Sequence, residues 1–254
     1  MSKKYFFFDI DGTLAPAGTL VIPPSAMRAL EALRAAGHFT ALATGRLLAD
    51  AACFAERYGF PALVADGGNS AALDGQTLFM DSLPVAACTA LCVRLDALGI
   101  PWALCVENET VRLTRDGSFL AAAGDSYFET RVIPGLDPAA FAHIYKVFIA
   151  CGPEREREID FGGLPTVRFT PRAVFIEPTD KARGVKRLLD ALGAPYGDAV
   201  VFGDGTNDLK LFDRAWLSIA MGNARPVLKE AADYVTDAVD CDGLWNACRH
   251  FGWI

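Results

Sequence analysis

Three short polar segments directly follow apolar runs in this sequence, and together they could bind a metal ion. Asp9 and Asp11 follow YFFF, residues 44–46 follow FTALA, and residues 204–208 follow AVVFG. Carboxylates gathered in one place repel one another and raise their own pKa values unless a cation compensates them. Mg²⁺ suits such a site because it binds one or two carboxylates, keeps water ligands and accepts phosphate oxygens. The segments therefore predict a hard, oxygen-ligated site.

The elements that must position these segments alternate between strands and helices. Helix patterns at residues 23–37, 47–59 and 180–193 are interleaved with apolar runs typical of buried strands at 39–43, 62–65, 199–203 and 217–221. We also predict helices from about Asp208 and over 226–232. Alternation of this kind predicts an α/β fold with a doubly wound parallel sheet, in which ligands bind beyond the carboxyl ends of the strands. The three polar segments can then converge on one crevice.

The pattern changes in the middle of the chain. Asp74-Gly75 is typical of a two-residue hairpin turn between residues 70 and 80. A helix at 84–98, two strands around Asn108, less regular elements and two β-rich runs before residue 177 then replace the alternation. We therefore predict a Rossmann-like core formed by residues 1–82 and 178–254, and an inserted α+β domain over 83–177.

Composition excludes several classes of protein. The chain has 254 residues, 52% of them hydrophobic, a net charge of −7 and no basic block, which argues against nucleic-acid and anionic-membrane partners. No apolar stretch approaches a membrane span or the core of a signal peptide. Seven scattered cysteines without a C-x-x-C motif indicate reduced thiols and a cytoplasmic protein. We interpret Cys88 and Cys92 as core residues rather than metal ligands.

Four sequence motifs carry a resemblance to a known family. DIDGTL at 9–14, TGR at 44–46, Lys181 and GDGTND at 203–208 resemble the motifs of the haloacid dehalogenase superfamily, in the family's order and spacing. The stretch AMGNARPVLKEAADYVT, residues 220–236, is similar to the segment that follows the fourth motif in Cof-type phosphatases of class IIB. The resemblance implies that the insert is a cap domain of the C2 type, which determines substrate specificity.

The resemblance implies a role for each catalytic residue. Asp9 takes the place of the nucleophile that is phosphorylated during turnover, which divides one difficult displacement into two steps. Asp11 takes the place of the group that protonates the leaving oxygen and then accepts a proton from water. Thr44 would donate to the phosphoryl oxygens, and Lys181 would supply a compact positive charge.

Binding roles are implied in the same way. Mg²⁺ would be held by Asp9, by the backbone carbonyl of Asp11, and by Asp204 with Asp208 in support. The positions that would contact phosphate or substrate are Gly12, Gly45, Arg46, Asn69 and Asn207.

The chain departs from the family pattern in two places. Position 182 is Ala, where relatives often have Gly after the motif lysine, and ADGGNS at 65–70 stands where relatives commonly show Asn-Gly. Gly67, Gly68 and Asn69 either line the mouth of the site or form a plain loop. Asn223 is expected to contact the loop of the fourth motif or the substrate, with a helix-cap role near Pro226 as the alternative.

The function implied is that of a Mg²⁺-dependent phosphatase acting on a small phosphorylated metabolite such as a sugar phosphate. Two alternatives stay open at this point: a phosphotransferase or phosphomutase that uses the same aspartyl phosphate, and a non-catalytic sensor of a phosphorylated ligand. The sequence does not determine the oligomeric state. It also does not decide among the polar residues of the insert that could contact substrate, namely Trp102, Glu107, Arg112, Arg115, Tyr127, Arg131 and Lys146.

Overall fold

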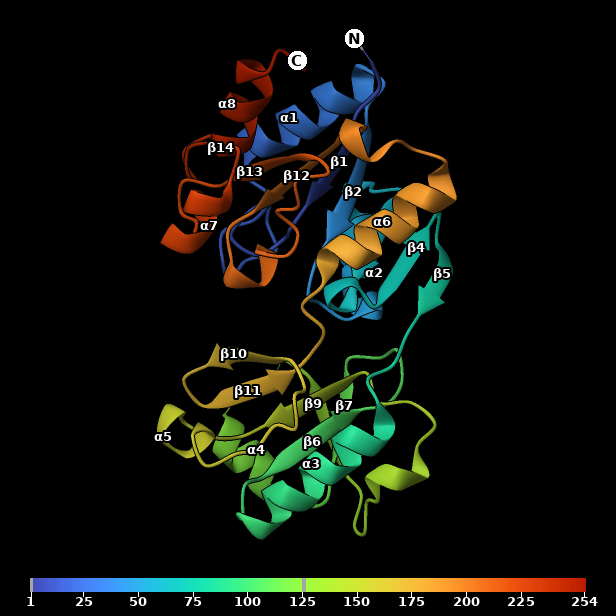
Figure 1. Ribbon diagram of the computed structural model, residues 1–254, viewed down its shortest axis with the longest axis vertical. Helices are drawn as coiled ribbons and strands as arrows, with labels where there is room; N and C mark the ends of the chain where they lie inside the picture. Colours follow the sequence, from blue (N-terminus) through green and yellow to red (C-terminus); the bar gives the residue numbers. More distant parts are fainter. Residues whose placement is uncertain (1, 125–126) are drawn as a thin grey trace. The chain divides into compact units, whose positions relative to one another are not determined.

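The computed structural model describes residues 2–124 and 127–254. The chain forms two compact units (Figure 1). The core unit comprises the chain up to Phe79 and from Thr179 onward, and the insert unit spans Met80–Pro178.

Within the described residues, the core unit contains one eight-stranded sheet. Its strands, in spatial order, are β14 (Tyr234–Val235), β13 (Leu217–Ala220), β12 (Ala199–Gly203), β1 (Tyr5–Phe8), β2 (Phe39–Ala43), β3 (Ala62–Ala65), β4 (Ser70–Leu73) and β5 (Gln76–Met80). Every pair from β14 to β3 is parallel, and β4 joins β3 antiparallel. The hairpin predicted at Asp74-Gly75 connects β4 to β5.

Strand β1 lies at the centre of this sheet because its side chains are apolar on both faces. Phe6, Phe7 and Phe8 are each fully buried. Successive residues of a strand point to opposite faces, and burial of each phenylalanine contributes about 1.5–3 kcal/mol. Phe7 belongs to the core cluster that contains Val185 and Leu188, whereas Phe6 packs edge-on against Trp253. Both faces of β1 are therefore covered, as a parallel sheet requires.

The core helices are α1 (Pro24–Ala35), α2 (Leu48–Tyr58), α6 (Lys181–Leu192), α7 (Pro226–Ala231) and α8 (Gly243–His250). Helix α6 buries an apolar stripe against the sheet, and Asp180 caps its start by accepting the N–H of Arg183 at 3.0 Å. The predicted doubly wound α/β fold is confirmed.

The prediction of a helix from about Asp208 was wrong. A short 3₁₀ helix, η4 (Thr206–Asp208), is followed there by turns. The Asp208 carboxylate folds back onto the N–H groups of Asp204 and Gly205, which tightens the chain into a loop. Strand β14 and helix α8 were not predicted.

The insert unit is an α+β module with a six-stranded sheet among the described residues. The spatial order is β10 (Thr166–Thr170), β11 (Ala173–Ile176), β9 (Lys146–Ile149), β6 (Trp102–Cys105), β7 (Val111–Thr114) and β8 (Glu129–Val132). Its α-helices are α3 (Val85–Ala97), α4 (Ser118–Ala123) and α5 (Pro153–Glu156). Cys88 and Cys92 lie on the buried side of α3 and belong to the core, as predicted, and burial raises the pKa of each thiol to about 12.

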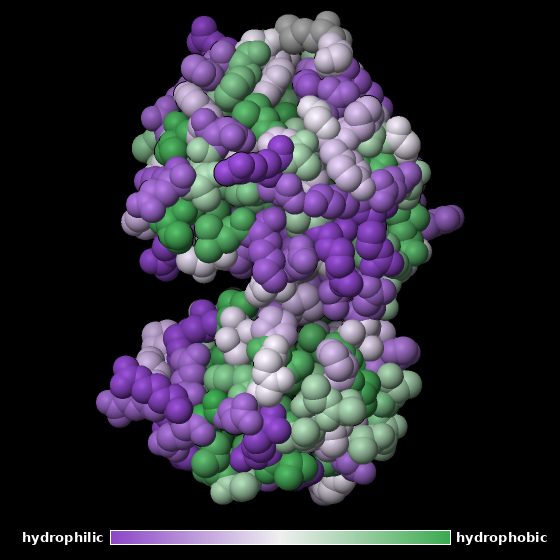
Figure 2. Space-filling view, viewed as in Figure 1, coloured by the Kyte–Doolittle hydropathy of each residue, from purple (hydrophilic) through white to green (hydrophobic). Residues whose placement is uncertain are grey.

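Figure 2 shows hydrophilic and hydrophobic residues interleaved over the visible face of each unit. In the part of the chain that the structure describes, no helix combines the length and the apolar character needed to cross a membrane.

Candidate active site

The three polar segments follow adjacent strands. Strand β1 pairs with β12 on one side and with β2 on the other, so Asp9, Thr44 and Asp204 emerge at the carboxyl ends of neighbouring parallel strands. The connections run outward in opposite directions from β1 and β12, which makes this edge the topological switch point of the sheet (Figure 1). Ligands of open α/β sheets bind at such a point.

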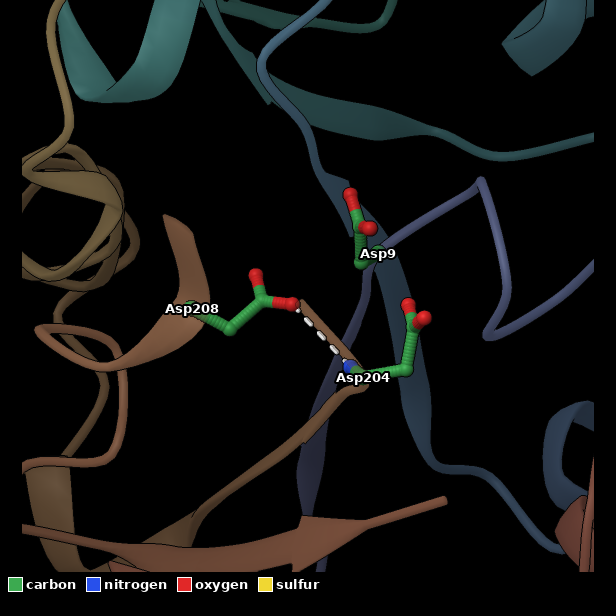
Figure 3. A group of neighbouring side chains, drawn as sticks. All are labelled: Asp9, Asp204 and Asp208. Atoms are coloured by element: carbon green, nitrogen blue, oxygen red, sulfur yellow. Dashed lines mark hydrogen bonds between the residues drawn. The ribbon is translucent and has the colours of Figure 1, made fainter. Parts of the chain in front are cut away.

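Three carboxylates meet at this edge. Asp9, Asp204 and Asp208 each offer an oxygen within 4.8 Å of the others. Figure 3 shows the carboxyl groups of Asp9 and Asp204 side by side, with Asp208 across from them and one of its oxygens on the N–H of Asp204. Asp9 and Asp208 are buried, and Asp204 is partly exposed. Residues almost two hundred positions apart in the sequence thus form one acidic group.

Lys181 places its ammonium between two of these carboxylates. Its Nζ donates to Asp9 Oδ1 at 2.8 Å and to Asp208 Oδ1 at 2.6 Å, and its side chain is 1% exposed. The other Asp208 oxygen accepts the N–H groups of Asp204 at 3.1 Å and Gly205 at 3.0 Å. Asp208 therefore anchors both the lysine and the loop, which leaves Asp9 and Asp204 as the carboxylates with more free oxygen lone pairs.

Burial and mutual repulsion shift the pKa values of the cluster. Burial raises the pKa of Asp9 to about 8, with Lys181 opposing the rise and Asp208 adding to it. Burial also raises the pKa of Asp204 to about 6, and Asp208 adds to that rise. Burial alone would lower the pKa of Lys181, but Asp208 and Asp9 outweigh it, and the net shift is upward. One ammonium thus leaves three carboxylates with an excess of negative charge.

This donor set fits a hard divalent cation. Carboxylate oxygens are the ligands that Mg²⁺ prefers, and a cation beside Asp9 and Asp204 would offset the repulsion that raises their pKa values. Asp9 and Asp204 are the residues that would hold it, with Asp208 in support.

Magnesium binding should stabilise the protein more at pH 8 than at pH 5.5. Because the pKa values of Asp9 and Asp204 are raised on folding, their contribution to metal-free stability is largest near pH 4 and is lost as the pH rises toward about 8. Mg²⁺ needs both groups ionised, so it competes with protons. Thermal melts at both pH values should show a gain at pH 8 of about 2.7 kcal/mol at 100 times the dissociation constant, and a smaller gain at pH 5.5. An equal gain at both would contradict metal binding at this cluster.

Gly12 makes room for Asp204. It has φ +82°, and a Cβ there would lie 2.2 Å from Asp204 Oδ2. Thr13, which follows it, donates from its hydroxyl to Asp204 Oδ1 at 3.1 Å. The loop after β1 therefore both admits the Asp204 carboxylate and orients it.

Gly12→Ala should weaken Mg²⁺ binding by about 10–100-fold, because the new methyl group displaces Asp204 and disturbed support of a ligand costs affinity of that order. Gly18→Ala is a matched control: Gly18 has φ +78°, but a Cβ there meets nothing within 4 Å. Calorimetric titration of both variants with Mg²⁺ checks this. An equal loss of Mg²⁺ affinity in the two variants would mean that backbone strain, and not the clash with Asp204, weakens binding. Parental affinity in Gly12→Ala would contradict the prediction.

Asp11 and Arg46 form a second polar group at the same edge. Arg46 Nε donates to Asp11 Oδ2 at 2.9 Å, and its Nη2 donates to Asp11 Oδ1 at 2.8 Å. The Arg46 Nη1 donates to Asp50 Oδ2 at 3.0 Å. The Asp11 side chain is 41% exposed, unlike the buried Asp9.

The remaining predicted residues lie around this edge in different settings. Thr44 is buried, and its hydroxyl oxygen accepts the N–H of Arg46 at 3.2 Å, which leaves its proton available to a ligand. Gly45 follows it in the same loop. Asn69 accepts a hydrogen bond from Arg183 at 2.5 Å, and Asn207 lies within η4, partly exposed.

The segment ADGGNS forms a turn whose structural role the sequence did not reveal. Asp66 (φ +50°), Gly67 (φ +58°) and Gly68 (φ +102°) are left-handed and buried. Gly67 accepts the N–H of Asp180 at 2.9 Å and donates its own N–H to the Thr44 carbonyl at 3.1 Å. A Cβ on Gly68 would lie 1.9 Å from the Asp180 carbonyl oxygen. This turn therefore connects the loop after β2 to the start of α6, whose first residue is Lys181.

The structure also bears on the expectations for positions 182 and 223. Ala182, the second residue of α6, is buried in a core cluster, and with Ala at this position Lys181 still contacts Asp9. Asn223 bonds a different loop from the expected one: its Nδ2 donates to the Gly12 carbonyl at 2.8 Å, and its Oδ1 accepts the N–H of Val239. It therefore supports the loop of the first motif.

Comparison with known proteins identifies the family. A family model described as haloacid dehalogenase-like hydrolase matches residues 6–159 and 168–248, which include the acidic cluster, Lys181 and the Asp11–Arg46 pair. The protein belongs to this family. The resemblance inferred from the motifs is thus confirmed, and the acidic edge of the sheet is the candidate active site of a haloacid dehalogenase-like hydrolase.

Individual relatives of this hydrolase cover nearly its whole length. Over 99% of the chain it is 30% identical to YkrA of Bacillus subtilis, which is named as a phosphatase, and it covers 99% of that protein. It is 32% identical, again over 99% of the chain, to a Streptococcus pyogenes protein named for phosphatase and peptidyl-prolyl cis-trans isomerase activities, but spans only 54% of that protein. The solved structure of BT4131, a subclass IIB sugar phosphatase, matches with a TM-score of 0.81 at 27% identity and covers 99% of this chain and 100% of that one.

Proposed function

We propose that this hydrolase is a Mg²⁺-dependent phosphatase that cleaves small phosphomonoesters through a phosphorylated Asp9. The observation that carries the proposal is the group of Asp9, Asp204 and Asp208 around the Lys181 ammonium. Phosphoryl transfer depends on positioning and on neutralising the charge of the phosphoryl oxygens, and a lysine beside a divalent cation provides both.

In the first step Asp9 acts as the nucleophile. A carboxylate oxygen of Asp9 forms a bond to phosphorus while the bond from phosphorus to the leaving oxygen breaks, and a proton from Asp11 converts that oxygen to an alcohol. Lys181 holds the other Asp9 carboxylate oxygen, and Thr44 offers its hydroxyl proton to a phosphoryl oxygen. Bound Mg²⁺ would offset the charge of the phosphoryl group beside Asp9 and Asp204.

In the second step water releases the phosphate. Water attacks phosphorus, the bond between phosphorus and the Asp9 oxygen breaks, and Asp11 accepts a proton from the water. Inorganic phosphate leaves, and Asp9 returns to its carboxylate form with Asp11 protonated for the next cycle. One residue thus gives a proton in the first step and regains one in the second.

For the substrate we propose a small phosphorylated metabolite, with sugar phosphates as the first candidates. Support comes from the sugar phosphatase BT4131, which is similar over nearly the whole chain, and from YkrA. We further propose that the insert unit selects the substrate, that the enzyme acts in the cytoplasm, and that nucleic acids are not among its partners. The absence of disulfides among the cysteines of the described residues supports the second point, and the net charge of −7 supports the third.

A phosphate-release assay tests the proposal. The protein is incubated with a panel of sugar phosphates, nucleotides and phosphorylated cofactors, with Mg²⁺ or with a chelator. We expect Mg²⁺-dependent release of inorganic phosphate from at least one member of the panel. Transfer of the phosphoryl group to a sugar hydroxyl without release would instead identify a phosphotransferase or mutase. Binding without turnover of any compound would identify a sensor.

A further inference from the structure

We propose that Arg46 is a positioning residue that aims the Asp11 carboxylate at the water attacking phosphorylated Asp9. This inference rests on the proposed function and assigns Arg46 a role different from the phosphate contact implied by the family resemblance. The observation that carries it is the pair of parallel hydrogen bonds, 2.9 and 2.8 Å long, from one guanidinium edge to both oxygens of Asp11.

Asp11 needs an external support more than the other acidic residues of the site. Asp9 and Asp208 are buried and are each fixed by Lys181, whereas the Asp11 side chain is 41% exposed. An exposed carboxylate samples several rotamers unless a partner fixes it. A fork of two N–H groups fixes both the position and the plane of a carboxylate, which a lysine ammonium cannot do. Arg46 thus supplies the orientation that burial supplies to Asp9.

Arg46 is itself held from three sides. Its Nη1 donates to Asp50, one helical turn further along the chain at the start of α2, and its side chain is only 14% exposed. Its backbone N–H donates to the Thr44 hydroxyl oxygen, and its carbonyl accepts the N–H of Asp66 at 2.8 Å. The Arg46 backbone is therefore held at the ends of two core strands and its guanidinium by α2, so the side chain can orient Asp11.

The nitrogens of the Arg46 guanidinium point toward carboxylates. Nε and Nη2 bind Asp11, and Nη1 binds Asp50. A phosphate-binding arginine would instead direct a pair of N–H groups at the phosphoryl oxygens. In this site that pair of donors is directed at Asp11, the group that transfers protons, so we assign Arg46 to the positioning of Asp11. With a leaving group that needs no proton, its effect then falls on the second step of the reaction.

Rapid-quench kinetics with p-nitrophenyl phosphate and Mg²⁺ separate the two steps. The nitrophenolate is a good leaving group that needs no proton, so its release reports formation of the phosphoenzyme, and phosphate release reports its hydrolysis. Arg46→Ala should slow hydrolysis by about tenfold or more, because misplaced general bases cost rates of that order, and should change phosphoenzyme formation by less than about threefold. When hydrolysis limits turnover, kcat and KM fall together and kcat/KM is kept.

Three further variants make the test specific. Arg46→Lys keeps the charge but not the fork of two N–H groups, so it should slow phosphoenzyme hydrolysis by less than Arg46→Ala does. It also replaces Arg46→Ala in the test if that variant does not fold. In an Asp11→Asn background Arg46→Ala should change hydrolysis less than about twofold, since the two residues act as one unit. Arg155→Ala, which removes a surface ion pair with Glu158, should leave both steps unchanged.

The outcomes distinguish this inference from the proposed function. A slower first step with a raised KM in the Arg46 variants would show that Arg46 binds phosphate, and losses that multiply in the double variant would show that it acts independently of Asp11. Either result overturns the inference while a phosphoenzyme on Asp9 leaves the proposed function intact. If the parental protein forms no phosphoenzyme, the proposed function itself fails.

Discussion

Replacing Asp9 with Asn should lower the rate of phosphate release on the order of 10⁴-fold or more, the scale of loss seen when a nucleophile is removed. An amide oxygen is a poor nucleophile toward phosphorus, so the phosphoenzyme cannot form. The metal-free variant should melt at the same temperature as the parental protein or higher, because the substitution removes one carboxylate from a buried group that carries excess negative charge. Steady-state assays and thermal melts of the same preparations measure both effects.

The matched control for this variant is Asp198→Asn. Asp198 is also in the core unit and also bonds a lysine, Lys4, at 2.7 Å, but that pair is partly exposed. The Asp198→Asn variant should retain parental activity. Parental turnover by the Asp9→Asn variant would refute a role for Asp9 as nucleophile, whatever the control shows.

Lys181→Met should lower the free energy of unfolding by about 3–5 kcal/mol, the usual cost of leaving buried charges without their partner. The variant keeps a side chain of similar length but removes the ammonium that bonds Asp9 and Asp208. Phosphate release should fall sharply as well. Urea denaturation of the metal-free protein gives the stability, and melts with added Mg²⁺ should recover part of the loss because a cation restores positive charge beside the carboxylates.

A second lysine on the same helix serves as the control. Lys186 bonds Asp213 at 2.5 Å, but both side chains are about one-third exposed. Exposed pairs of this kind contribute about 0–1 kcal/mol. Lys186→Met should therefore destabilise the protein by no more than that, and Lys181→Met combined with Asp208→Asn should be less destabilised than Lys181→Met alone. Similar losses in the two single variants would contradict a special electrostatic role for Lys181.

The sequence predicted the parts of the fold that follow from local pattern. Runs such as YFFF and AVVFG predicted buried strands, and each polar segment after such a run was found at one edge of the sheet. Helix α6 was predicted from the helix pattern of its segment, and in the structure the helix ends at Gly193, which is left-handed. These signals lie within a few residues of one another, so a single sequence is enough to read them.

Other features depend on contacts between distant residues. The helix predicted from Asp208 did not form, because the Asp208 side chain bonds backbone N–H groups of its own loop and Lys181 on another element. The fork between Arg46 and Asp11 joins residues 35 positions apart, and the bond from Asn223 to Gly12 joins residues 211 positions apart. The only sequence signal for the turn at 66–68 is its pair of adjacent glycines, which indicates unusual backbone but not its partners.

Trapping the phosphorylated enzyme tests the central claim most directly. The protein is mixed with p-nitrophenyl phosphate and Mg²⁺, quenched in acid during turnover, digested and analysed by mass spectrometry. We predict that the added mass of one phosphoryl group is found on the peptide that contains Asp9, that fragmentation places it on Asp9 itself, and that hydroxylamine removes it. A turning-over enzyme that carries no phosphoryl group, or carries it on another residue, would contradict the account.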